Sequence, residues 1–366
     1  MLLLLTMLLA ACSDDADDGV DRKDDGGDVL QLVAYGQLQT DAVPANTRAI
    51  TSENHGNYEL YEGANSIGVF LTYQTKNAPK EVSTFTYDAT DGWMSQVKVK
   101  VEDNPYRIYG FMPTTFESAQ DFKYQIAPLS TGETYNNGAI LTFTNLPPVA
   151  KEDFCLLTGV QDLGGVKTAT LNLKRGVFSY QGRAKGQNYA NLMFEHLYGG
   201  VLFHLKIAEA YNQLRTIKLK EFKLLTTNIY TIADMVIKVN PTDDEATPFS
   251  VTSYTMTSSE GSGATLFTSE EGEELKTDTP CDISGYFFPL LSSTNNIGHE
   301  LAMECTYDVY DKKGNLVRKS CVARNSLPDM ESTPGTRNIL TLTVEPTYLY
   351  VLSEPDLDNP TITISN

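Results

Sequence analysis

The chain has 366 residues, enough for a sizeable core, and its 47 Asp and Glu against 28 Lys and Arg leave a net charge of −19. This charge argues against binding to nucleic-acid phosphates or to anionic lipid through electrostatics. Twenty Tyr and fifteen Phe, together with many Thr and Val, favour strands over helices.

The first twelve residues form a short apolar segment that ends in Ala10-Ala11-Cys12. Its apolar run, residues 2–9, is too short to cross a bilayer, which takes about 20 residues, but it fits the core of a signal peptide. The Leu-Ala-Ala-Cys ending resembles the bacterial lipobox, in which the cysteine is acylated and becomes the first residue. Residues 1–12 are therefore predicted to be a lipoprotein signal peptide with Cys12 as the lipidated residue; a chance cysteine after an apolar stub is the alternative.

An acidic tether follows Cys12. Eight Asp against Arg22 and Lys23 leave residues 13–28 near −6, too polar and self-repelling to pack. A solvated spacer is the minimal interpretation. An acidic stretch directly after a lipidated cysteine also resembles the surface-export signal of Bacteroidetes lipoproteins, which predicts an outer-membrane lipoprotein precursor at the cell surface.

Residues 29–38 are predicted to form one extended strand. Leu30, Leu32, Ala34 and Leu38 fall on one side of it because side chains alternate along a strand. A polar loop that contains Arg48 follows. Residues 13–48 are thus a tether plus a separate first strand.

The rest of the chain alternates in short apolar bursts separated by Gly, Pro and Asn, which is typical of β-sandwiches. The bursts of a first domain, residues 49–186, are 67–73, 83–87, 96–101, 107–112, 139–143 and 167–173. Those of a second domain, residues 187–366, are 192–197, 201–207, 217–225, 233–239, 284–289, a hairpin of 300–310 and 316–323, 339–345, 348–352 and 360–366. The one helix candidate is 208–214. The predicted fold class is all-β, in two tandem β-sandwich domains.

The sequence shows no recognisable catalytic motif, and we expect no enzyme, metal site or cofactor. A dyad of Cys155 with His196 is compatible with the spacing, but a hydrogen-bonded structural role for His196 is the preferred alternative. Cys305 and Cys321 are free to pair across a hairpin in an oxidising compartment, but free buried thiols are the preferred interpretation. The acidic runs, such as residues 270–274, are interpreted as solvated loops.

Four segments occur in the order found in the fimbrillins of the Bacteroidales, the Mfa-like or type V pilin family, and resemble them. They are Trp93 with 106–113, 153–159, 192–196 with 201–207, and 334–335 with 338–344. The chain departs from the family at its end, where Thr-Ile-Thr-Ile-Ser-Asn stands in place of a Trp-bearing segment. The resemblance spans residues 49–352.

The resemblance implies a shaft or tip subunit of a fimbrium that supports adhesion, with transthyretin-like Greek-key domains. Family pilins travel as lipoproteins, and an Arg-specific protease then removes the lipid and the first strand. This removal opens a hydrophobic groove, and another subunit's C-terminal strand fills it. Arg48 is the implied cleavage site, and an ordinary exposed arginine is the alternative. The implied donor residues are Tyr348, Tyr350 and Leu352, or Ile362 and Ile364; a C-terminal strand packed in its own domain is the alternative.

The partners implied are other fimbrial subunits, the maturation protease and, before processing, the outer membrane through the lipid. A different class of protein also fits the residues: a surface lipoprotein that keeps its lipid, does not polymerise and binds glycan or another surface ligand.

Overall fold

The computed structural model describes residues 28–39, 66–73, 79–88, 92–116, 119, 121–166, 175–183, 187–227, 229, 231–240, 248–257, 261–288, 301–328, 330, 334–335, 337–348 and 355–365. Cys12, Arg48, Tyr350 and Leu352 lie outside these residues, as does the strand expected at 167–173. Within the described residues, the predicted all-β class is confirmed. The one α-helix there is α1 (Glu209–Asn212), inside the expected segment 208–214, and no helix among them is long and apolar enough to cross a membrane.

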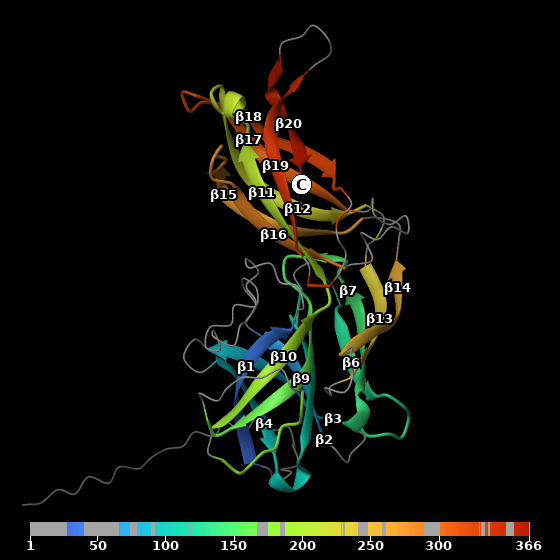
Figure 1. Ribbon diagram of the computed structural model, residues 1–366. Coiled ribbons are helices and arrows are strands. Elements are labelled where there is room, and N and C mark those ends of the chain that lie inside the picture. The colour runs from blue at the N-terminus through green and yellow to red at the C-terminus, as the bar shows by residue number, and fades with distance from the viewer. Residues whose placement is uncertain are drawn as a thin grey trace, which may run out of the picture.

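The first sheet closes into a barrel in the order β1-β10-β9-β5-β2-β3-β4 (Figure 1). Its strands are β1 (Asp28–Gln39), β2 (Ser66–Tyr73), β3 (Pro79–Asp88), β4 (Gly92–Val99), β5 (Tyr106–Met112), β9 (Cys155–Gly164) and β10 (Asn188–His196). The sequence predicts a β-sandwich in this region. The sheet closes instead because β1 pairs on both sides, with β10 and with β4.

Three further sheets complete the described fold, with strand orders β20-β19-β11-β16-β8, β15-β12-β17-β18 and β14-β13-β7-β6. The short 3-10 helices η1 (Val101–Asp103) and η2 (Tyr135–Asn137) lie in connections. The strands are β6 (Lys123–Pro128), β7 (Ala139–Leu146), β8 (Val149–Ala150), β11 (Gly199–Ile207), β12 (Arg215–Thr226), β13 (Thr231–Val239), β14 (Phe249–Thr257), β15 (Gly263–Glu274), β16 (Cys281–Phe287), β17 (Leu301–Asp311), β18 (Leu316–Ser326), β19 (Arg337–Tyr348) and β20 (Pro355–Ser365).

Hydrogen bonding crosses the domain boundary predicted near residue 186. β10 belongs to the barrel, and β13 pairs with β7, so strands from beyond residue 186 complete sheets that begin before it. In Figure 1 the barrel fills the lower half, the β14-β13-β7-β6 sheet stands beside it, and the other two sheets form the upper half. The division into two domains stays a prediction.

Two apolar cores explain this arrangement. Inward-facing residues of the barrel, such as Val69, Ile108 and Leu192, form one core. A larger core lines the other three sheets and includes Phe111, whose strand β5 is almost entirely buried. β5 is buried because one face lines the barrel and the other faces the β14-β13-β7-β6 sheet, so an alternating pattern is replaced by a continuous one.

Several strands were not expected from the sequence because they are mostly solvent-exposed. β6, β14 and the second half of β15 carry few buried residues, so their apolar alternation is weak. The prediction that residues 270–274 form a loop is wrong. In the register of β15 with β12, Glu274 lies opposite Lys218, where opposite charges are favourable neighbours.

The predicted hairpin of residues 300–323 is confirmed as β17 and β18. Its register also explains the cysteines: Cys305 lies opposite Ala323, and Cys321 lies opposite Tyr307. The two thiols therefore do not face each other across the hairpin. Cys155, Cys281, Cys305 and Cys321 are all free.

Candidate assembly site

The strand predicted at residues 29–38 is confirmed as β1, and it occupies the closing position of the barrel. It runs parallel to β10, with Leu32 opposite Asn188 and Leu38 opposite Phe194. On its other side it runs antiparallel to β4, with Leu30 opposite Val97. Removal of β1 would leave both of these strands with an unpaired edge, since no other strand in the described part of the chain joins them there.

Of the two strands that flank β1, β10 is the one whose side-chain burial is described throughout. Ala190, Leu192 and Phe194 point into the barrel core, and all three are fully buried. Met193 is equally buried on the opposite side of the strand, where it lies outside the barrel core. β10 is therefore packed on both faces, and its backbone pairs with β9 as well as with β1.

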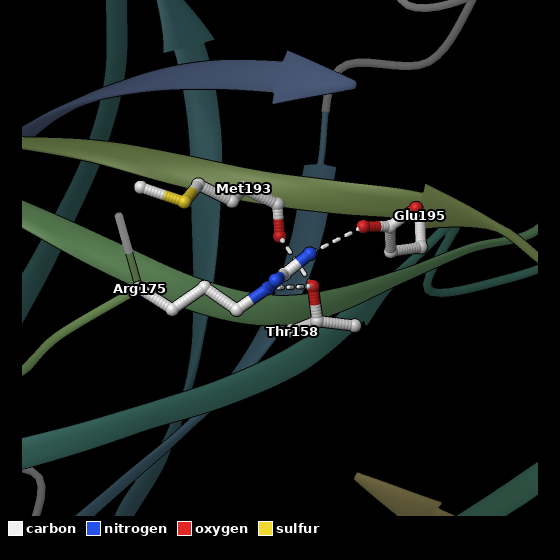
Figure 2. Close-up of polar contacts among 4 residues, drawn as sticks. All are labelled: Thr158, Arg175, Met193 and Glu195. Carbon is white, nitrogen blue, oxygen red and sulfur yellow. Dashed lines mark hydrogen bonds and ion pairs between the residues drawn. The ribbon is translucent and has the colours of Figure 1, made fainter. Parts of the chain in front are cut away.

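A cluster of polar contacts fastens β10 to β9 on the outside of the barrel (Figure 2). The Arg175 guanidinium donates from Nη2 to Glu195 Oε1 at 2.6 Å and from Nε to Thr158 Oγ1 at 3.4 Å. Thr158 Oγ1 in turn donates to the Met193 carbonyl at 3.4 Å. These contacts join residues that are 17 to 35 positions apart in the chain, and they hold β10, the strand next to β1, against β9.

Gly159 makes room for this arginine. A Cβ atom there would lie 2.5 Å from Arg175 Cγ, which is closer than real contacts allow. Because glycine lacks that atom, the arginine stem can lie flat across β9. The ion pair is mostly withdrawn from water, with side-chain exposure of 11% for Arg175 and 15% for Glu195.

We expect Arg175→Ala to lower the free energy of unfolding by about 2–3 kcal/mol, because Glu195 loses a charged partner in a largely dry site. In a double-mutant cycle with Glu195→Gln, the double variant should lose less stability than the sum of the two single losses. Urea unfolding measures both. Lys223→Ala is the control: it breaks the more exposed pair with Glu221, 31% exposed on each side, and should cost less than about 1 kcal/mol. An equal loss in the free energy of unfolding for Arg175→Ala and Lys223→Ala would contradict this prediction.

The C-terminal donor candidates fall on two different strands. Ile362 and Ile364 lie on β20, opposite Val344 and Leu342 of β19. Ile362 is 3% exposed, and its carbonyl accepts a hydrogen bond from Asn325 Nδ2 at 3.0 Å. Tyr348 is the last residue of β19. β20 is thus packed within its own chain, as an edge strand with one partner in the sheet.

The structure brings Cys155 and His196 together, with Asp153 as a third member that the sequence analysis did not single out. Cys155 and His196 are opposite residues of β9 and β10, and Sγ lies 3.7 Å from His196 Nδ1. That nitrogen is also hydrogen-bonded to Asp153 Oδ2. The hydrogen bond expected for His196 is present, with Asp153 as its partner. The missed signal was the Asp-x-Cys spacing, which places two side chains on one face of an extended segment.

Burial and the carboxylate set the ionisation of this group. Burial lowers the pKa of His196, but the charge of Asp153 and the hydrogen bond to it outweigh burial, so the pKa is raised. Burial, and then the negative charge of Asp153, raise the pKa of Cys155 well above its ordinary value. The thiol is therefore neutral and a poor nucleophile, which argues against a catalytic dyad.

Comparison with known proteins finds no matching family model and no matching curated protein. The chain is structurally similar over nearly its full length to solved fimbrial and adhesion proteins of the Bacteroidales. A fimbrial protein from Bacteroides vulgatus is 15% identical, with 92% of this chain and 98% of that chain covered and a TM-score of 0.37. The fimbrial anchor protein Mfa2 from Porphyromonas gingivalis is 11% identical, with 92% and 97% covered and a TM-score of 0.28. At these levels no residue role is carried over to this chain.

Proposed function

We propose that this protein is a structural subunit of a type V fimbrium, in the shaft or at the tip, and that it assembles by protease-triggered strand exchange and supports adhesion. The observation that carries the proposal is the position of β1. This N-terminal strand closes the barrel by pairing on both of its edges, with β10 and with β4.

The physical reason is that a strand inserted between two others leaves a complete slot when it is removed. The slot has unpaired amides and carbonyls on both sides, which a second extended strand satisfies by β-augmentation. The twelve residues of β1 span roughly 40 Å at about 3.3 Å per residue, which is the length a replacement strand must match.

A C-terminal strand is a suitable replacement. β20 lies at the edge of its sheet, so it can leave by giving up its backbone pairing with β19 and the hydrogen bond from Asn325 of β18. Each buried Ile or Leu of an inserted strand contributes roughly 1.5–3 kcal/mol, which offsets part of the association entropy. In this proposal Ile362 and Ile364 are donor residues, and Tyr348, Tyr350 and Leu352 are the alternative set.

The remaining parts of the proposal come from the sequence. Cys12 carries the lipid of an outer-membrane precursor, and cleavage after Arg48 by an Arg-specific protease releases the lipid, the tether and β1. The partners are other fimbrial subunits. We also propose that the two domains have the tandem transthyretin-like Greek-key arrangement. In this arrangement the first domain, together with β10, supplies the groove, and the second domain supplies the donor strand.

Processing by an Arg-specific protease tests the function directly. The expected result is a mature chain that begins at Ala49, identified by mass spectrometry, and filaments in negatively stained electron micrographs. Arg48→Ala should leave the chain uncut and without filaments, and Arg22→Ala is the matched control that should be processed normally. A chain that still begins at acylated Cys12 after protease exposure, and stays monomeric with affinity for a polysaccharide, would support the surface-binding lipoprotein instead.

A further inference from the structure

Three metal-ligand side chains meet where β9 begins and β10 ends. The sulfur of Cys155, one ring nitrogen of His196 and a carboxylate oxygen of Asp153 all lie within 4.8 Å of one another. Among the described residues this is the one group of three or more such side chains that is close enough to share an ion. Nothing in the proposed assembly function uses it.

The cluster is buried and incompletely bonded. Cys155 is fully buried and Asp153 is 2% exposed. Asp153 Oδ2 bonds to His196, but the other oxygen, Oδ1, is buried and has no hydrogen-bond partner within the described part of the chain. A buried carboxylate oxygen normally has such a partner, so this atom is an independent sign that the cluster has capacity for a ligand.

We propose that Asp153, Cys155 and His196 bind a zinc ion. Zinc takes sulfur, nitrogen and oxygen ligands in tetrahedral geometry. With a Zn–S bond of about 2.3 Å and a Zn–N bond of about 2.0–2.1 Å, the sulfur and nitrogen of a tetrahedron stand about 3.6 Å apart. The separation of Cys155 Sγ and His196 Nδ1 is 3.7 Å. A thiolate ligand favours zinc over calcium or magnesium.

The charges also balance. One thiolate and one carboxylate neutralise Zn²⁺, and the imidazole binds as a neutral ligand. On binding, the Cys155 thiol proton and the Nδ1 proton of His196 both leave to solvent, and Nδ1 exchanges its hydrogen bond with Asp153 for a bond to the metal. His196 is the more exposed member, with its side chain 13% exposed against 3% for Asp153, so a water molecule can complete the tetrahedron from that side.

The site lies where the chain passes between the barrel and the five-stranded sheet. Asp153 lies between β8, which pairs with β16, and β9 of the barrel, and Cys155 is the first residue of β9. His196 ends β10, and the chain then continues through Leu197 and Tyr198 into β11. These two connections are already joined by a hydrogen bond from Leu197 N to the Phe154 carbonyl at 2.8 Å and by the bond between His196 and Asp153. Zinc would replace the second of these with bonds to three side chains and stiffen the junction.

Titration of the purified full chain with Zn²⁺ and with Co²⁺ tests the proposal. We expect one equivalent of zinc to bind, a melting temperature that rises with zinc concentration, and a cobalt spectrum that combines tetrahedral bands with a thiolate-to-cobalt charge-transfer band. Cys155→Ser should abolish the charge-transfer band and weaken zinc binding by about 100-fold or more. Asp153→Asn keeps the side-chain shape and should weaken binding as well, so it serves if the serine variant fails to fold.

The controls are Cys305→Ser and His204→Gln, which remove a buried thiol and a histidine elsewhere and should bind zinc as the parent does. Two results would overturn the proposal. One is a parent chain that binds no stoichiometric zinc, which would make the cluster a hydrogen-bonded group only. The other is a cobalt complex without the thiolate band, or with the band intact in Cys155→Ser.

Discussion

Deletion of residues 1–48 is expected to convert the protein from a monomer into a ladder of oligomers. Without β1, β10 loses its partner from Asn188 to Glu195, and β4 loses its partner from Trp93 to Val99. Unpaired strand edges of this length recruit other strands. Size-exclusion chromatography with light scattering measures the change, and a chain of residues 49–366 that stays monomeric would contradict strand exchange.

Two additions to that experiment identify the strands involved. A peptide of residues 28–39, supplied in trans, should occupy the slot and suppress the ladder. The same peptide with Ala34→Pro is the matched control and should not suppress the ladder, because proline removes an amide from the middle of the strand.

Further deletion of residues 354–366 should leave an open but monomeric chain. Unchanged polymerisation after that deletion would exclude β20 as the donor and leave the set Tyr348, Tyr350 and Leu352.

Phe111→Ala is expected to lower the free energy of unfolding by about 3–5 kcal/mol, the largest effect of any single substitution considered. Phe111 is fully buried on β5 and stands at the centre of an aromatic cluster. Its ring centroid lies 4.5 Å from that of Tyr124 on β6 and 5.1 Å from that of Phe143 on β7. It also contacts Phe154, at 6.0 Å, in the segment that leads into β9. The substitution therefore leaves a cavity between the barrel and the neighbouring sheet.

Urea unfolding checks this prediction, with Tyr254→Ala as the aromatic control. Tyr254 is 39% exposed on β14 and has one aromatic neighbour, Phe288, at 5.5 Å between ring centroids, so its removal should cost less than about 2 kcal/mol. A loss for Phe111→Ala no larger than that of the control would mean that the cluster does not hold the two layers together.

Much of the strand order was predictable because burial on one face leaves a period of two in the sequence. β7 and β12 show this alternation plainly, and the β17–β18 hairpin adds a turn in which Gly314 has a φ of 84°, a conformation that glycine tolerates. β14 shows it only weakly, because Phe249, Val251 and Met256 are half-buried against the core and a register shift between Val251 and Ser253 interrupts the alternation. Its place in the sheet depends on backbone pairing with β13, which residue type does not report.

The candidate sites were likewise predictable in part from local sequence and in part only from strand pairing. The first strand was predicted from its own residues, but its parallel pairing with β10, a strand more than 150 residues away, leaves no local signal in either sequence. Cys155 and His196 were noted as a possible pair, yet they meet only because the register of β9 and β10 sets them opposite each other. Asp153 joins them because it precedes Cys155 by two residues and so shares its side of the chain.

By itself the sequence determined the all-β class, a separate first strand and the character of most strands, because each depends on the chemistry of neighbouring residues. Only the tertiary structure decided which strand edges meet: the closure of the barrel by β1, the pairing of β20 with β19, and the meeting of Asp153, Cys155 and His196. The reason is that sheets are joined by backbone amides and carbonyls, which every residue except proline carries alike.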